Sequence, residues 1–147
     1  MSDNLPKRTI RARLVIRGPE DEVRVFAAAS GMAFDTLKRW SRKLPSRDGA
    51  HVWSIGTGEE QERPGRDAGR LLQEVLDRVE PGLLKWRDLG SPGAVRVWLQ
   101  IVTYISECQG PALAFESELI KRIAATGLLF DIDVYCLGEE RKLDAHE

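Results

Sequence analysis

Two carboxylates stand one residue apart near the C-terminus, in the run LLFDIDVYCLG at residues 128–138. Alternation in this run predicts a strand with Asp131, Asp133 and Tyr135 on one face and apolar side chains on the other. Two carboxylates at this spacing could clamp a metal ion, work as an acid–base pair, or form the charged half of a binding surface. The elements that position them decide between these chemistries.

A second alternating run carries two arginines at the same two-residue spacing as the aspartates. TIRARLVIRG at residues 9–18 carries Arg11 and Arg13 on one face and apolar residues on the other. In a ferredoxin-like sheet the first and last strands are antiparallel neighbours, so we expect the arginines to face Asp131 and Asp133. Such cross-strand ion pairs contribute about 0.2–1 kcal/mol each. A metal site is disfavoured because calcium takes about six or more oxygen ligands, and the arginines favour the charged carboxylates, which makes a poor general acid.

The remaining pattern predicts one α+β domain over residues 8–138, with tails at residues 1–7 and 139–147 expected to be flexible. A helix led by Glu20 is expected to stop at Gly31, and the clearest amphipathic helix runs from Arg70 to about Leu84, where Pro81 and Gly82 kink or end it. Further strands are expected at residues 51–58 and 94–105, and a helix at residues 116–126 that buries Leu119, Ile120 and Ile123 and stops at Gly127. The stretch from Met32 to Gly49 is interpreted as a short helical turn and a basic loop, and residues 58–69 as a polar linker. We therefore expect a four-stranded sheet with three main helices, in the order β-α-β-α-β-α-β, ferredoxin-like in spirit.

This arrangement gathers a polar and aromatic set on one sheet face. Arginine and aromatic residues are over-represented at interaction hot spots, so the set is a candidate binding surface. The alternative is that the central helix covers this face, in which case Trp98 and Tyr104 are simply packed. The candidate residues are Arg11, Arg13, Arg96, Trp98, Gln100, Tyr104, Asp131, Asp133 and Tyr135.

Composition and the remaining motifs exclude several functional classes. The 147 residues are 42% hydrophobic and 31% charged with a net charge of −1, as expected for a soluble globular domain without global attraction to nucleic acid. No apolar run of membrane-spanning length and no signal-peptide order occur in the sequence, and two cysteines, Cys108 and Cys136, are too few for a disulfide scaffold. We therefore expect a cytoplasmic protein.

No catalytic constellation is evident in the sequence. His51 is the only histidine inside the expected domain, the cysteines lack CxxC spacing, and the glycine-containing GTGEEQ lacks the ending of a phosphate-binding loop. The KRWSRK run at residues 38–43 interleaves cations with Trp40, but no RNA-binding signature accompanies it, so nucleic acid is disfavoured as a partner. We expect no catalytic residue, no metal and no cofactor.

The C-terminal run GPALAFESELIKRIAATGLLFDIDVYCL resembles the domain-of-unknown-function family numbered 4279. Members pass from a Pro-Ala-Leu-like segment through a helix and a small-residue stop into an Asp-Ile-Asp-hydrophobic-Tyr strand. The first strand ending in Gly18 and the Val52-Trp53-Ser54 strand are similar too, so the resemblance covers roughly Arg8 to Leu137. The segment from Ala29 to Phe34 lacks the proline that members usually carry.

The resemblance implies a bacterial, mostly single-domain protein without assigned chemistry, and some members are suspected of being immunity proteins that neutralise toxins by binding them. We therefore predict a non-enzymatic, cytoplasmic protein-binding domain with a toxin-like protein partner, whose most concrete form is a toxin-neutralising immunity protein. The alternative is a small-ligand-binding protein or an enzyme with an unrecognised site.

Overall fold

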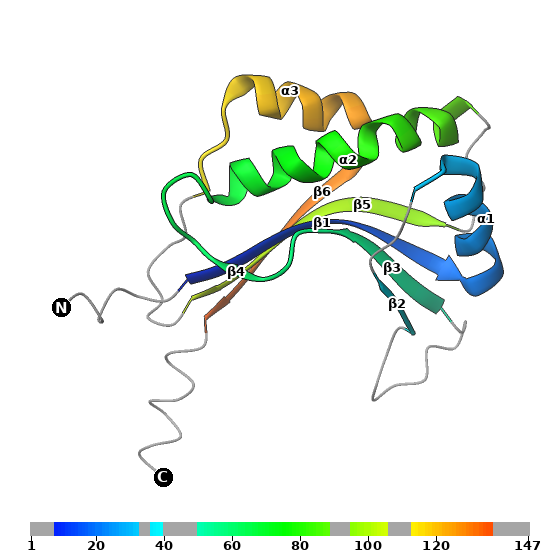
Figure 1. Ribbon diagram of the computed structural model, residues 1–147, viewed down its shortest axis with the longest axis horizontal. Coiled ribbons are helices and arrows are strands. Elements are labelled where there is room, and N and C mark those ends of the chain that lie inside the picture. The colour runs from blue at the N-terminus through cyan, green and yellow to red at the C-terminus, as the bar shows by residue number, and fades with distance from the viewer. Residues whose placement is uncertain (1–7, 33–35, 40–49, 89–94, 106–112, 137–147) are drawn as a thin grey trace, which may run out of the picture.

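The chain forms a curved sheet with its helices on one side (Figure 1). The computed structural model describes residues 8–32, 36–39, 50–88, 95–105 and 113–136. Its helices are α1 (Glu20–Ser30), α2 (Ala68–Asp88) and α3 (Ser117–Thr126). Its strands are β1 (Arg8–Pro19), β2 (Thr36–Arg39), β3 (Ala50–Gly56), β4 (Glu60–Gln61), β5 (Arg96–Ile105) and β6 (Leu129–Cys136). The predicted α+β class with three helices is confirmed for these residues.

The order of the strands differs from the expected ferredoxin-like one. Five strands lie in the order β2-β3-β1-β5-β6, and the short β4 pairs with β1. β1 is antiparallel to β3, β4 and β5, whereas β5 and β6 are parallel and joined through α3. The expectation of a four-stranded sheet with neighbouring first and last strands is wrong, because β5 lies between β1 and β6. A strand–helix–strand crossover commonly returns the chain parallel to the strand it left, and β5, α3 and β6 do so here.

Two short strands, β2 and β4, are present that the sequence pattern does not predict. β2 lies within the segment interpreted as a helical turn and a basic loop, most of which falls outside the described residues, and β4 lies within the expected linker. Both are too short to show an alternating pattern. Arg66 holds β4 beside α2, because its guanidinium donates to Glu60 with an Nε–Oε1 distance of 2.6 Å and also to Glu74. This hydrogen bond with Arg66 lowers the pKa of Glu60.

The hydrophobic core lies between the sheet and α2. The core face of β1 contributes Ile10, Ala12, Leu14 and Ile16, all fully buried, and α2 contributes the predicted stripe of Leu71, Leu72, Val75, Leu76 and Val79. Burying each leucine or isoleucine side chain stabilises the fold by about 1.5–3 kcal/mol. α2 continues past Pro81 to Asp88, contrary to the expectation of an end near Leu84. Pro81 is on the exposed side of α2, so the carbonyl group that loses its partner there can be hydrated.

The predicted glycine stops are confirmed for both shorter helices. Gly31 after α1 has a φ of 67° and Gly127 after α3 has a φ of 69°, the left-handed conformation that glycine adopts without a steric penalty. In α3, Leu119 and Ile123 are buried as expected, but Ile120 is exposed. α3 packs against α2 as an outer helix, so only a narrow stripe of it is covered.

Cys136 ends β6 and is disulfide-bonded. Cys108 lies outside the described residues. This bond differs from the expectation of a protein from a reducing cytoplasm, because disulfides are more typical of oxidising compartments. Separately, none of the helices in the described part of the chain has the length and apolar character needed to cross a membrane.

Gly56 allows β3 and β1 to approach closely at the end of β3. A Cβ atom at this position would overlap the Ala12 carbonyl oxygen and lie 2.6 Å from the Cβ of Arg13. Thr57 fixes the approach: its N–H donates to the Ala12 carbonyl at 2.9 Å, and its hydroxyl accepts from the Ala12 N–H at 3.0 Å. Only glycine therefore fits beside Arg13.

We predict that Gly56→Ala lowers the free energy of unfolding by about 2 kcal/mol or more, because backbone atoms must move apart to admit the methyl group. Urea denaturation measures this change. Gly58→Ala is the matched control, since no atom lies within 4 Å of an added Cβ there, and its effect should stay below about 0.5 kcal/mol. Equal effects of the two substitutions would contradict the close approach.

Candidate functional site

The strand registers place all nine predicted residues on one face of the sheet, which we name the polar sheet face. Arg13 on β1 pairs with Gln100 on β5, and Gln100 pairs with Asp131 on β6. Tyr104 and Tyr135 are paired in the same way. Because paired residues on neighbouring strands point to the same side, the polar sheet face comprises Arg11, Arg13, Arg96, Trp98, Gln100, Tyr104, Asp131, Asp133 and Tyr135.

The central helix does not cover this face. α2 packs against the opposite side of β1, and all three helices lie on that side of the sheet (Figure 1). The alternative in which α2 buries Trp98 and Tyr104 is therefore wrong. Most of the polar sheet face is nevertheless half-buried: Gln100 at its centre is buried, whereas Arg96 and Tyr135 at its margins are exposed.

Gln100 joins the cation to the carboxylates. The Nε of Arg13 donates to Oε1 of Gln100 at 2.7 Å. The side-chain amide of Gln100 donates to Oδ2 of Asp133 at 2.7 Å and lies 3.4 Å from Oδ2 of Asp131. The expected direct pairs between the arginines of β1 and the aspartates of β6 are thus wrong, because β5 separates the two strands. A neutral amide with both a donor and an acceptor bridges the gap instead.

Partial burial shapes the electrostatics of the two arginines. Burial lowers the pKa of Arg13, and the nearby positive charge of Arg11 adds to this, whereas the neighbouring Tyr104 and Asp133 oppose it. The Nε of Arg11 is buried and has no hydrogen-bond partner among the described residues. A buried donor without a partner costs about 1–3 kcal/mol.

Aromatic rings mark one end of the polar sheet face. Tyr104 and Tyr135 stack with ring centroids 5.2 Å apart and an interplanar angle of 19°. Arg96 is at the other end of β5, about 26 Å from Tyr104 along the strand, so these two residues do not act at one point. Leu129, which pairs with Trp98 and is exposed, extends the face and was missed. It has the same parity as Asp131, so period-two alternation could have found it.

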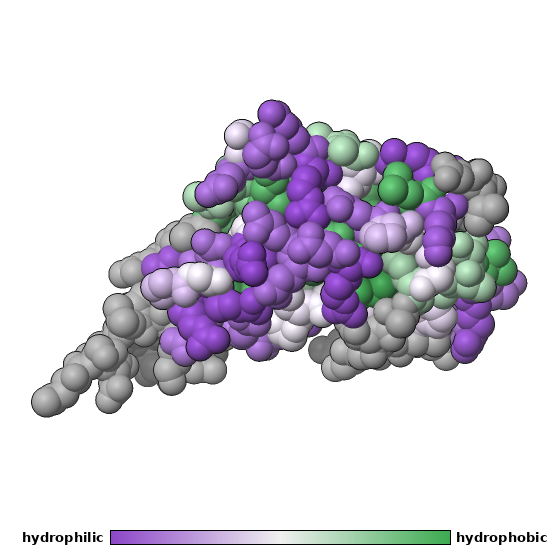
Figure 2. All heavy atoms as spheres, turned by 45° about the horizontal axis from the view of Figure 1, so that its top comes forward, coloured by the Kyte–Doolittle hydropathy of each residue, from purple (hydrophilic) through white to green (hydrophobic). Residues whose placement is uncertain are grey.

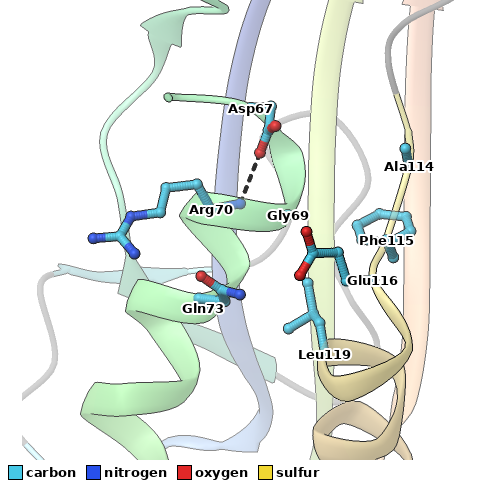
Figure 3. A pocket seen from close by; sticks show the side chains of 8 residues that line it. All are labelled: Asp67, Gly69, Arg70, Gln73, Ala114, Phe115, Glu116 and Leu119. Atoms are coloured by element: carbon cyan, nitrogen blue, oxygen red, sulfur yellow. Dashed lines mark hydrogen bonds between the residues drawn. The ribbon is translucent and has the colours of Figure 1, made fainter. Parts of the chain in front are cut away.

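A separate cleft of about 450 Å³ opens between the N-terminal ends of α2 and α3 (Figure 3). Its wall is formed by Asp67, Gly69, Arg70, Gln73, Ala114, Phe115, Glu116 and Leu119. Asp67 caps α2, since its Oδ1 accepts from the Arg70 N–H at 2.9 Å. The guanidinium of Arg70 extends away from Glu116. No local pattern predicts this cleft, because two helix ends far apart in the sequence form it.

Few of the described side chains are arranged for acid–base catalysis or for metal binding. Within the ranges that the structure describes, no three His, Cys, Asp or Glu side chains gather closely enough to hold a metal ion. His51 is half-buried on β3, with its Nε2 3.6 Å from Oε2 of Glu20 at the start of α1. What the polar sheet face can do chemically is present charges, hydrogen-bonding groups and aromatic surface.

We predict that Gln100 transmits the coupling between Arg13 and Asp133. A double-mutant cycle with Arg13→Met and Asp133→Asn, followed by urea denaturation, should show a coupling of about 0.5–1 kcal/mol. In a Gln100→Leu background the coupling should approach zero. As a control, the direct pair between Arg122 and Glu80, with an Nε–Oε1 distance of 3.0 Å, should keep its coupling in that background. An unchanged Arg13–Asp133 coupling without Gln100 would contradict this account.

Comparison with protein-family models places the chain in a family. The family model described as Domain of unknown function (DUF4279) matches residues 8–137, nearly the whole chain. No curated protein and no solved structure matches the chain. The match covers every helix and strand described above, β1 at its start and β6 at its end. The chain belongs to the DUF4279 family.

Proposed function

We propose that the chain is a non-enzymatic protein-binding module that docks a protein partner on the polar sheet face. The observation that carries this proposal is the segregation of the fold: the three helices lie on one side of the sheet, and the nine polar and aromatic residues lie on the other. Figure 2 looks onto the helix side, where hydrophilic side chains dominate the surface over α2 and α3. Such a surface suits solvent, whereas arginine and aromatic groups on a sheet suit an interface.

The hydrogen-bonded network favours binding by limiting the entropy lost on association. Arg13, Gln100 and Asp133 are already fixed by one another, so a partner need not order these side chains. The mechanism is occlusion: the sheet presents a rigid charged and aromatic surface that covers the active cleft of the partner.

The most concrete form of this function is a bacterial immunity protein that neutralises a toxin. The suspected immunity role of some relatives supports this form, and so does a surface of both charge signs, which fits a protein cleft. The net charge of −1 makes nucleic acid a weaker candidate partner. The runner-up is a small-ligand-binding protein or an enzyme that uses the cleft between α2 and α3, whose volume of about 450 Å³ falls in the range of ligand sites.

We predict that a tagged chain captures a stoichiometric protein partner from host lysate after nuclease treatment, and that Arg96→Glu and Trp98→Ala each reduce capture at least about tenfold. Arg96 is exposed, so its charge reversal tests the face without disturbing the core. Val25→Ala and Leu84→Ala on the helix side are matched controls, since both side chains are exposed there. Circular dichroism verifies that every variant is folded.

Capture that survives both face variants, or that disappears in the helix-side controls, would contradict the proposed face. Loss of all captured protein on nuclease treatment would contradict a protein partner. A clean preparation that instead binds a small molecule, with binding lost in Gln73→Ala, would favour the cleft.

The cytoplasmic location is tested separately. A cytoplasmic protein should carry reactive thiols when it is taken from host cells into denaturant that contains a thiol-labelling reagent and no reductant. In an oxidising compartment the disulfide at Cys136 should stay intact, so its thiol would not be labelled. Full labelling would support the cytoplasm, and absence of labelling until reductant is added would contradict it.

A further inference from the structure

β6 is the last strand at one edge of the sheet in the part of the chain that the structure describes. The strand order ends at β6, which pairs with β5 alone among the described strands. Along its outer side, an edge strand offers the N–H and carbonyl groups of alternate residues to another strand. Cys136, the last residue of β6, is disulfide-bonded, and the rest of the strand, from Leu129 to Tyr135, is long enough to support an added strand.

The side chains of β6 make this edge attractive to another strand. Leu129 is 70% and Tyr135 47% exposed on the polar sheet face, while Ile132 is 36% and Val134 48% exposed on the other. The strand LFDIDVYC contains no proline and no lysine, and its charged residues, Asp131 and Asp133, oppose an acidic strand but attract a basic one. Exposed apolar groups on both faces are what an added strand would cover.

The charges of β6 argue against a second copy of this chain as that strand. Antiparallel pairing centred on Ile132 would set Asp131 of each copy opposite Asp133 of the other, and parallel in-register pairing would set each aspartate opposite itself. Like charges directly opposite each other destabilise a pair of strands. The same carboxylates suit a strand that carries cations at alternate positions.

The hydrogen bonding of the two carboxylates leaves room for such cations. Among the described residues, the neutral side-chain amide of Gln100 donates to both Asp131 and Asp133, and the guanidinium of Arg13 lies behind that amide. Tyr135, exposed on the same face and stacked on Tyr104, adds a ring face for a cation.

We propose that β6 binds an extended segment of a partner protein as an added strand, with lysine or arginine at alternate positions facing Asp131 and Asp133. The apolar residues between these cations cover Ile132 and Val134. Main-chain hydrogen bonds supply the affinity and the alternating cations the specificity. This inference rests on the proposed function and names both the chemistry of the partner and how it docks.

The test uses a fluorescein-labelled peptide of alternating lysine and valine, with fluorescence anisotropy as the readout. A peptide of the same composition with its lysines in one block, and one of alternating glutamate and valine, are the peptide controls. The wild-type chain should bind the alternating lysine peptide at least about tenfold more tightly than either control. Asp131→Asn with Asp133→Asn should weaken that binding about tenfold. Asp21→Asn with Glu118→Gln removes the same charge from exposed helix positions and should leave binding unchanged.

Several results would overturn the inference. One is that the peptide with its lysines in one block binds as tightly as the alternating peptide. Another is that the Asp21→Asn, Glu118→Gln control weakens binding as much as the Asp131→Asn, Asp133→Asn variant does. A third is that the alternating peptide does not bind. Sedimentation showing a dimer that tightens in the Asp131→Asn, Asp133→Asn variant would overturn it in favour of a second copy.

The two proposals fail separately. If Arg96→Glu abolishes partner capture but the wild-type chain does not bind the peptide, the polar sheet face is supported as the binding surface and the added strand is rejected. Peptide binding with capture unaffected by Arg96→Glu and Trp98→Ala would support the strand and reject the wider face.

Discussion

The arrangement depends on the alternation of β1 at the centre of the sheet. β1 pairs with β3 on one side and with β5 on the other, and both registers run along most of its length. Its even-numbered residues from Ile10 to Ile16 are buried against the helix layer, while Arg11 and Arg13 point away from it. A slip of one residue would turn the arginines into the core beneath α2, which fixes the register strongly. The polar sheet face is thus a direct consequence of packing on the opposite side.

Gln100 then determines how that face is organised. It lies between the cation of β1 and the carboxylates of β6, and its amide is oriented by one acceptor contact and two donor contacts. Gly56 leaves the space beside Arg13 that a larger residue would occupy. The network is therefore held by backbone geometry as well as by its own hydrogen bonds, which makes it a rigid feature on which a partner could dock.

Local patterns revealed the faces of the strands but not the neighbours of each strand. Period-two alternation placed Arg13, Gln100 and Asp133 correctly on one face, since facing is a property of each strand alone. Strand order depends on non-local packing, and the crossover through α3 puts β5, not β1, beside β6. Because β5 lies between β1 and β6, Arg13 and Asp133 are joined by hydrogen bonds through Gln100 and not by the expected direct ion pair. β2, β4, the cleft at Glu116 and the exposure of Ile120 likewise depend on tertiary contacts that leave no local pattern.

The most direct test of the central claim, that the polar sheet face binds a protein, is carboxyl footprinting of the chain with and without its captured partner. If the polar sheet face is the binding surface, labelling of Asp131 and Asp133 falls on binding, while labelling of Asp21 on α1 and Asp77 on α2 is unchanged. Protection of the helix carboxylates with Asp131 and Asp133 still fully labelled would contradict it.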